Sequence, residues 1–459
     1  MHILLLKRIV IAAVLPIIIS LPPGEAIAIT LDEAVRASLG NSKSVAAARQ
    51  NWIATREAVG INTSTSDLSA RLTSTGTLAN TDERAGSGFN KSQTLSTGIT
   101  VSKNLYDGGQ TQENVRLAQL NLQIASAAYA KSEQMLILMT IEAYLNVLKT
   151  VREVKLLEQN LTRLKAHVDA AKIRVDAGAA TPTRLAEAKA RFARAQSDAI
   201  LTQTRLANAE DNFRSVTGVD AKNFKQPALA KDLPADLLSA ETIAQKGHPD
   251  MLSAIAAERV ANQAFNTFKA AVRPTLTLSV SADSRIATGA SRDKDEVTAQ
   301  LVFSSPLLST NATRSKARNI AANYEASKLN RAETMRKIKL AARETFRNWK
   351  TTAARVNAVV SEIKAFRMVA KGIANETQFG QKTMLDLFDA EKDVNDSELS
   401  LVTAEHNQLL AAFRLKAAIG GLTAKQLGLG DVLGPLEDLP DTKNPFQNTF
   451  PFRRTTASD

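Results

Sequence analysis

Two long segments without glycine or proline constrain the fold of this 459-residue chain more than any other feature. The first runs from Gln110 to Ala177 and the second from Leu307 to Lys371. Glycine and proline are the residues that interrupt helices, so each segment can form one continuous helix. At ~1.5 Å per residue, a helix of about 65 residues is on the order of 100 Å long, far beyond the usual length of about 11–12 residues. Such a helix needs a partner that runs beside it.

The apolar residues of the first segment supply that partner, because they recur in alternating steps of three and four. The steps continue after Gly178, where Thr181 and Pro182 have the residue types of an N-cap and a first helical position. This spacing predicts two arms of a helical hairpin with a heptad seam. Many seam positions are alanine, which favours close packing into a sheet or tube of helices; an isolated antiparallel coiled coil is the alternative. The seam positions are Val154, Leu157, Leu161, Leu164, Val168, Ala171 and Val175, then Leu185, Ala188, Phe192, Ala195, Ala199, Thr202, Leu206, Ala209, Phe213 and Val216.

The second half of the chain repeats the first at a constant offset of 202 residues. The hairpin seam recurs after the second long segment, with returning-arm residues such as Leu387 and Leu415. A constant offset that places glycine at both hairpin tips and at both ends indicates an internal duplication. The matched pairs are Gly178 with Gly380, Thr181 with Thr383, Glu142 with Glu344, and Gly218 with Gly420.

Each half also contains two segments in which apolar and polar residues alternate, which is the period of a strand. The predicted strands lie at about 64–82, 91–105, 273–286 and 296–306. They are long enough to cross an outer membrane at a tilt, but four strands cannot close a barrel. Open strand edges in lipid leave backbone groups unpaired, so closure requires several chains, and three would supply twelve strands. Two small water-exposed sheets are the alternative.

The N-terminus has the features of a secretory signal peptide at residues 1–28. Lys7 and Arg8 are followed by an apolar stretch at 9–20 that is too short to span a bilayer, and Ala26-Ile27-Ala28 is a cleavage pattern. An uncleaved membrane anchor is the alternative. The rest of the chain has no run of about 18 or more apolar residues, so we expect no membrane-spanning helix in the mature protein.

The predicted domain order follows from these elements. The first repeat covers 29–218, begins with a helix at about 31–60, and contains a coil hairpin at about 110–217. A linker or equatorial region follows at 219–238. The second repeat covers 239–425, begins with a helix at about 239–270, and contains a coil hairpin at about 311–418. The C-terminal tail, 426–459, holds several prolines and no clear period, so we expect it to be extended or disordered.

Composition excludes several classes of function. The chain has no cysteine and only four scattered histidines, which removes disulfides, thiolate metal sites and histidine metal clusters. Its net charge of +12 is spread along the helices without interleaved aromatic residues, a pattern of a solvated surface rather than of a nucleic-acid site. No phosphate-binding loop, nucleophile elbow or dinucleotide fingerprint is present. We therefore expect no enzyme activity, no cofactor and no nucleic-acid partner.

Between about 30 and 425 the chain resembles the TolC-type outer-membrane efflux and secretion duct family (outer membrane factors). The segments that carry the resemblance are TLDEAVRASLGNS at 30–42, LYDGG at 105–109, EAY at 142–144, AGAATPTRLAEA at 177–188, SVTG at 215–218, GQKTMLDLFDAEKDV at 380–394 and AAIGG at 417–421. No single segment is decisive, but their order and spacing together are specific.

The resemblance implies a mainly α fold with a β-barrel portion. A homotrimer would form a 12-stranded outer-membrane β-barrel that continues into a long periplasmic α-helical coiled-coil barrel. It also implies a passive exit duct in the outer membrane of a Gram-negative bacterium. The implied partners are outer-membrane lipid, a periplasmic adaptor (membrane fusion) protein, and an inner-membrane ABC or proton-driven pump. The cargo, drug or secreted protein, is left open.

The resemblance also suggests candidate site residues near the hairpin tips. Asp386 and Asp389 fall on positions that form acidic rings at the periplasmic entrance in relatives, and their spacing of three places both on one helix face. The alternative is that aspartate in a first helical turn simply complements the helix dipole. The predicted adaptor-contact residues at the tips are Gly178, Thr181, Gly380 and Thr383.

The first repeat departs from the family pattern at the gate. Relatives often have aspartate after the tip threonine, where this chain has Arg184, and a gate tyrosine where it has Thr377. Lys382 stands where relatives place a basic residue that pairs with that aspartate. Arg184 and Lys382 are therefore candidate gate residues that either repel each other or pair differently, for example Arg184 with Asp386.

Two other functions compete with the duct. An exported periplasmic coiled-coil adaptor or structural protein is the first, but an adaptor normally has one coil hairpin, whereas this chain has two hairpins and two strand pairs. An enzyme is the second, and the absence of a recognisable catalytic motif disfavours it.

Overall fold

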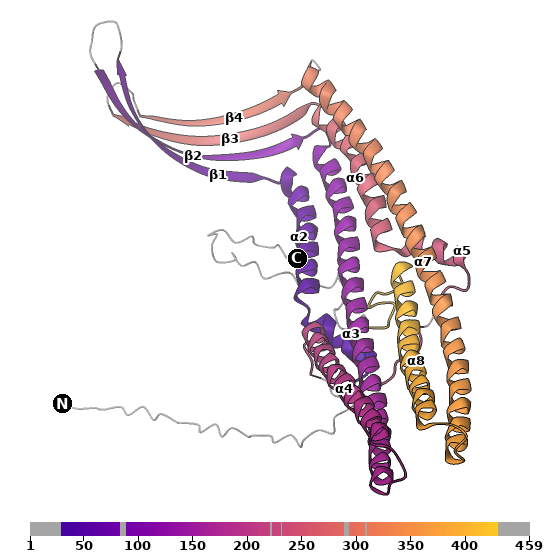
Figure 1. Ribbon diagram of the computed structural model, residues 1–459. Coiled ribbons are helices and arrows are strands. Elements are labelled where there is room, and N and C mark those ends of the chain that lie inside the picture. The colour runs from indigo at the N-terminus through magenta and orange to yellow at the C-terminus, as the bar shows by residue number, and fades with distance from the viewer. Residues whose placement is uncertain are drawn as a thin grey trace, which may run out of the picture.

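The computed structural model describes residues 29–82, 89–220, 223–230, 232–288, 293–307 and 310–429. The predicted signal peptide, the turns of both strand pairs and most of the predicted C-terminal tail lie outside the described residues. The described chain is elongated: the strands project from one end of a helical body, and the tips of two helical hairpins lie at the other end (Figure 1).

The first repeat runs from α1 to α4. Its elements are α1 (Leu31–Asn41), α2 (Lys43–Thr63), the short 3-10 helix η1 (Ser64–Ser66), β1 (Ser69–Asp82), β2 (Phe89–Tyr106), α3 (Gln110–Asp176) and α4 (Pro182–Thr217). The second repeat has the same order. Its elements are α5 (Leu237–Gly247), α6 (Pro249–Ala271), β3 (Thr275–Thr288), β4 (Lys294–Ser304), α7 (Asn311–Gln378) and α8 (Met384–Ala418).

The single helices expected at about 31–60 and 239–270 are each two helices. Ser42 is extended, with φ −70° and ψ 116°, and its hydroxyl caps α2 by accepting from the Val45 amide. His248 is extended in the same way, because the following Pro249 disfavours a helical residue before it and begins α6. The apolar period continues across both breaks, so periodicity alone did not reveal them.

The strand boundaries also differ from the prediction. Residues 64–66 form η1, and β1 begins only at Ser69. β3 and β4 each lie about two residues from their predicted limits, between Pro274 and Pro306. Proline has no amide hydrogen to donate to a strand ladder, so these two prolines limit the paired region at its helical end.

The four strands form one antiparallel sheet in the order β1-β2-β3-β4. A row of the register links Leu72, Ile99, Ala282 and Val297 across the sheet. The face that contains this row carries most of the exposed large apolar side chains of the strands: Leu72, Leu78, Leu95, Ile99, Leu278, Val280, Ile286, Val297, Leu301 and Phe303. The next row links Thr73, Gly98, Asp283 and Glu296, so the opposite face is polar. The sheet therefore has one apolar and one polar face, and β1 and β4 are its edges.

The core lies in the middle of the helical body. One cluster joins α1, α3, α4, α8 and the segment after α8 around Tyr144, Ile141 and Phe213. A second cluster joins α5, α6, α7 and α8 around Met251 and Leu415. The C-terminal part of α8 thus packs against the middle of α3, and this contact joins one hairpin to the other (Figure 1). Within the described residues, no helix combines the length and apolar character needed to cross a bilayer.

A buried carboxylate fastens the segment after α8 to α3. Glu133 on α3 accepts a hydrogen bond from the Ala424 amide at 2.5 Å. Burial raises the pKa of Glu133, because it disfavours the charged carboxylate more than this hydrogen bond favours it. The folded protein therefore binds this proton more tightly than the unfolded chain does.

We expect the Glu133→Gln protein to keep its stability better than the wild type as the pH rises. A group whose pKa is raised in the folded protein contributes to the free energy of unfolding. This contribution is complete at pH values below the ordinary pKa of glutamate, near 4.5, and it is lost as the pH rises through the pKa of the folded state. Glutamine stays neutral and keeps an acceptor for Ala424. Thermal unfolding between about pH 4.5 and neutral measures the slope. The exposed Glu57→Gln variant is the control, and equal slopes for Glu133→Gln and wild type would contradict the prediction.

Candidate functional site at the hairpin tips

The two hairpin tips are built in the same way. Gly178 and Gly380 adopt left-handed conformations, with φ +71° and +74°. The next amides turn back to the preceding helix: Ala179 donates to the Arg174 carbonyl at 2.7 Å, and Gln381 donates to the Glu376 carbonyl at 2.9 Å. A positive φ is the reason that glycine ends each descending helix.

The tips differ in how the returning helices begin. The Thr383 hydroxyl accepts from the Asp386 amide at 3.2 Å, and the Asp386 carboxylate accepts from the Thr383 amide at 2.9 Å and from its hydroxyl at 2.7 Å. This capping box lowers the pKa of Asp386, mainly through the Thr383 amide and hydroxyl. In the first repeat the corresponding position is Arg184, and Thr181 forms no side-chain cap. Asp386 thus has the helix-capping role, and its place in an acidic ring stays a prediction.

We expect Arg184→Asp to complete a capping box at α4. Aspartate at this position can accept from the Thr181 amide, as Asp386 does from Thr383. Removal of the cation from the positive end of the helix acts in the same direction. Hydrogen exchange of the amides in the first turn of α4 should become slower, whereas Asp386→Ala should accelerate exchange in the first turn of α8. Unchanged exchange in both variants would contradict this account of the tips.

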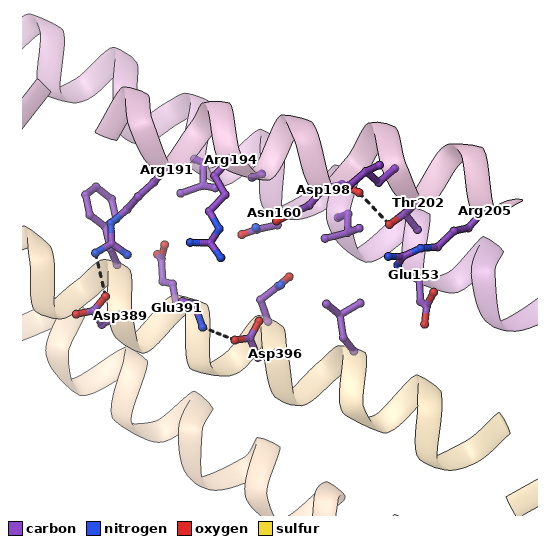
Figure 2. Close-up of a pocket in the computed structure, with 18 residues that line it drawn as sticks. Glu153, Asn160, Arg191, Arg194, Asp198, Thr202, Arg205, Asp389, Glu391 and Asp396 are labelled. Carbon is purple, nitrogen blue, oxygen red and sulfur yellow. Dashed lines mark hydrogen bonds and ion pairs between the residues drawn. The ribbon is translucent and has the colours of Figure 1, made fainter. Parts of the chain in front are cut away.

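Asp389, the second predicted ring residue, is engaged by the other hairpin. Its carboxylate lies 3.0 Å from the Arg191 guanidinium of α4. Figure 2 draws this contact as a dashed line between the two labelled side chains. Arg191 also lies over the ring of the buried Phe388, 5.4 Å from the ring centre, and is 3.5 Å from Glu187. The sequence placed Asp389 in a possible acidic ring but did not reveal the contact with Arg191, because the distance between α4 and α8 is not a property of either helix alone.

The candidate gate residues Arg184 and Lys382 stand at the tips of different hairpins. Among the described residues, neither forms an ion pair, and Arg184 is not paired with Asp386, whose carboxylate binds Thr383. The Thr377 hydroxyl donates to the Ile373 carbonyl of its own helix at 2.7 Å. Within one chain, the described residues therefore show no contact of Arg184, Lys382 or Thr377 that would close the entrance.

A groove of about 610 Å³ runs between the hairpins above the tips (Figure 2). α3 contributes its floor, and α4 and α8 form its walls. The α4 wall carries Arg191, Arg194 and Arg205, whereas the α8 wall carries Asp389, Glu391 and Asp396. The two hairpins are thus incompletely packed against each other along this stretch, and polar groups line the space between them.

Pairs of oppositely charged or hydrogen-bonding side chains connect α3 to α8 along their length, and one of them, at Glu391, borders the groove. Arg414 lies 2.7 Å from Glu142, Arg152 lies 2.7 Å from Glu405, and His167 lies 2.9 Å from Glu391. From one pair to the next, the residue number on α8 decreases as the residue number on α3 increases, as expected for antiparallel helices. We call these three pairs the inter-hairpin ladder. The sequence analysis missed it; a search for opposite charges in antiparallel register between the two repeats could have found it.

The described residues at the tips and in the groove include charged and polar side chains but no recognised metal site. Among the described residues, no group of three or more histidine, aspartate or glutamate side chains is arranged to hold a metal ion. Charged side chains of both signs line the groove. The molecule has two distinct ends: the tips of the long helical hairpins lie at one, and the sheet with its apolar face lies at the other.

A duplicated helix–strand–strand–helix unit with these two ends defines an envelope channel protein. The chain matches the family model described as outer membrane efflux protein over residues 34–219 and 242–421, and it belongs to this family. The expected resemblance, the mainly α fold with a β portion and the location in the outer membrane of Gram-negative bacteria are thereby confirmed. Members of the family are channels and not enzymes.

Individual relatives agree with this assignment. The chain is 28% identical over 335 residues to outer membrane efflux protein BepC of Brucella suis biovar 1, and the matched region covers 72% of this chain and 73% of BepC. It is 22% identical over 365 residues to outer membrane protein TolC of Escherichia coli K12, and the matched region covers 75% of this chain and 73% of TolC. A crystal structure of a membrane protein from Pseudomonas aeruginosa has the same fold, with a TM-score of 0.75 at 16% identity over 86% of this chain and 90% of that one.

Proposed function

We propose that three copies of the chain form a passive exit duct through the outer membrane. The observation that carries the proposal is the sheet: its exposed apolar face fits lipid, and its two edge strands, β1 and β4, need partners in lipid. Pairing of β4 in one copy with β1 in the next would close twelve strands and place the polar face inside.

The same proposal assigns the hairpins to the periplasm. Twelve long helices from three copies would surround a tunnel that continues the barrel. The tips at Gly178, Thr181, Gly380 and Thr383 would contact a periplasmic adaptor protein, and an inner-membrane ABC or proton-driven pump would supply the energy. Asp386 and Asp389 would then form acidic rings near the entrance, with the charge of Asp389 reduced by Arg191.

Mass measurement of the detergent-solubilised protein, followed by planar-bilayer recording, tests this function. We expect a trimer that forms channels and that stays with the outer membrane after high-salt washing. A folded, water-soluble monomer would contradict the proposal, as would a folded trimer without conductance. A deletion strain assayed for antibiotic sensitivity and for secreted proteins would distinguish the two kinds of cargo, a drug or a secreted protein.

A pair of neighbouring substitutions tests which face of the sheet meets lipid. Val297 is on the apolar face and is 78% exposed, whereas Thr298 is on the polar face. Arginine at a lipid-facing position costs about 2–4 kcal/mol near the bilayer midplane. We expect Val297→Arg to reduce the amount of trimer in the outer membrane and Thr298→Arg to leave it near the wild-type level. Equal effects of the two variants would contradict the assigned orientation.

A further inference from the structure

The positive charge of the protein is concentrated on one helix, α7. This helix contains fifteen lysine and arginine residues, five glutamates and no aspartate. The equivalent helix of the first repeat, α3, has almost the same length but contains nine basic and seven acidic residues. The excess of positive charge therefore belongs to the second repeat alone and is not a requirement of the fold that the two repeats share.

Part of this charge forms a regular row along one side of α7. Four basic residues recur at multiples of seven, with Asn357 at the remaining position: Arg343, Lys350, Lys364 and Lys371. We call these five residues the basic stripe. Each directly follows a buried or half-buried residue of the packed seam: Ala342, Trp349, Val356, Ile363 and Ala370. Because the stripe keeps its place beside the seam, it stays on one side of the helix along its length.

The first repeat has no such row. The positions 202 residues earlier carry no net charge: Ile141, Leu148, Lys155, Thr162 and Asp169. Both repeats have the packed seam, so helix packing does not require the basic stripe. A row of like charges on an exposed face, at the period of the seam and absent from the duplicate, points to a contact that only the second hairpin makes.

Most of the basic stripe has no acidic partner within the chain. Arg343 pairs with Glu241 of α5. Lys350 lies over the ring of the preceding tryptophan, 4.8 Å from the ring centre. Lys364 and Lys371 are exposed, and neither forms an ion pair with another described residue. The part of the stripe nearer the tip therefore offers unpaired cations at a spacing of about 10 Å.

Helix α5 shows which side of the helical layer carries the basic stripe. The long helices form a single layer, in the order α2-α3-α6-α7 next to the sheet and α4-α3-α8-α7 next to the tips. α5 packs onto this layer through Ala240 and Ala244, which share a core cluster with Ile338 and Ala342 of α7, and it projects beside α7 (Figure 1). The contact of Arg343 with α5 places the stripe on the same side.

In the proposed duct, this side is the outer one. Twelve helices that lie about 8–10 Å apart form a ring about 30–40 Å across between helix axes. The helices themselves leave an opening of roughly 20–27 Å. Three copies of α5, each about 10–12 Å thick, would fill that opening. A passive duct needs it open, so α5 and the basic stripe face the periplasm.

We propose that the outer face of α7, between α5 and the tip of the second hairpin, is a docking surface for an α-helix of a periplasmic partner that carries acidic residues at every seventh position. The inference rests on the proposed function, because the duct places this face in the periplasm. A helix that runs beside α7 repeats its contacts every seven residues, so each lysine of the basic stripe would meet one carboxylate. An unstructured polyanion has no such repeat.

Binding of a designed helical hairpin tests the charge and the spacing of the partner together. The first probe carries glutamate at every seventh residue along one outer face. The second has the same composition with its glutamates distributed around the helix, and the third is unstructured polyglutamate of equal charge. Each is titrated against the detergent-solubilised protein at about 0.15 M salt. We expect the first probe to bind more tightly than the other two, and to bind less tightly as the salt concentration rises.

Paired substitutions on α7 and α3 locate the binding surface. Lys364→Gln with Lys371→Gln should weaken binding of the first probe by about 2- to 30-fold, because two exposed ion pairs are lost. Lys155→Gln with Lys165→Gln is the matched control: it removes two exposed lysines from α3 and should leave binding unchanged. Lys364→Glu with Lys371→Glu should bind a probe that has lysine in place of glutamate, which an unfolded protein would not do.

Equal weakening by the α7 and α3 pairs would overturn the inference, because the effect would then come from net charge alone. Equal binding of the three probes would also overturn it, since the helical spacing would be irrelevant, and so would a wild-type protein that binds none of them. Planar-bilayer recording separates these outcomes from the proposed function. A trimer that conducts but ignores the first probe refutes only the docking surface, whereas a folded protein without channels refutes the duct and with it the outward placement of the stripe.

Discussion

The Gly420→Ala protein is expected to be less stable than the wild type by about 2–5 kcal/mol, because backbone strain and a steric clash add at this position. Gly420 follows α8 with φ +77°, a conformation that alanine adopts only with strain. A Cβ atom there would lie 2.5 Å from the Gly247 carbonyl oxygen and 2.7 Å from the His248 Cα. Both neighbours are backbone atoms between α5 and α6, so they cannot move aside as a flexible side chain would.

Gly380→Ala is the matched control for this prediction. Gly380 has nearly the same φ, +74°, but a Cβ atom would meet nothing within 4 Å. Only the conformational strain remains, which is about 1–2 kcal/mol. Denaturant unfolding in detergent, followed by circular dichroism, compares the two variants. Equal losses of stability would show that the contact with Gly247 is unimportant.

The Tyr144→Ala protein is expected to lose about 3–5 kcal/mol of stability, the usual range for removal of a large buried aromatic ring. Tyr144 is fully buried, and its ring meets Phe224 and Phe213 edge to face at 5.2 and 6.2 Å. Its hydroxyl lies within hydrogen-bonding distance of the Ile29 carbonyl, 2.9 Å away, and of the Lys225 carbonyl. This residue thus holds the start of the described chain and the segment between the repeats onto α3.

Tyr144→Phe separates the hydroxyl from the ring. Loss of the donor removes the bond to these carbonyls, and because the Ile29 carbonyl still accepts from the Lys225 amide at 3.2 Å, the cost should be that of one ordinary hydrogen bond, about 0.5–1.5 kcal/mol. Burial raises the pKa of Tyr144 to about 12, so the hydroxyl remains a donor throughout the pH range of such experiments. Tyr324→Phe is the control, because Tyr324 contacts Phe265 through its ring and is only partly buried. Comparable losses in the two phenylalanine variants would contradict the role of the Tyr144 hydroxyl.

The sequence predicted those parts of the fold that depend on residues close to one another along the chain. The heptad steps and the lack of glycine and proline indicated α3, α4, α7 and α8, and alternation indicated all four strands. These patterns are local, because a helix or strand presents one face at a fixed residue period. The breaks at Ser42 and His248 interrupt the backbone without interrupting that period, so they were missed.

The repeated glycines show where local information ends. Gly218 and Gly420 are equivalent in the duplication, as the sequence offset predicted, and in the structure both have a positive φ. Their surroundings differ: a Cβ atom at Gly218 would meet the Asn41 side chain at 2.8 Å, whereas one at Gly420 would meet backbone. In both repeats the neighbour is the last residue of the first helix, Asn41 of α1 or Gly247 of α5, so the difference comes from the residue type at that position and from how closely the two segments approach.

By itself, the sequence determined the helical hairpins, the strand pairs, the duplication and the class of channel, since each depends on residue type and spacing along one segment. Only the tertiary structure decided that Asp389 meets Arg191 and that His167 contacts Glu391 and Phe388. The cap that Asp386 forms on its own helix is local, because its partner Thr383 is only three residues away. The physical reason is that the register between the two hairpins is set by the core, where α3 packs against α8. This core lies far from the tips, so the residues near the tips do not determine which of them meet.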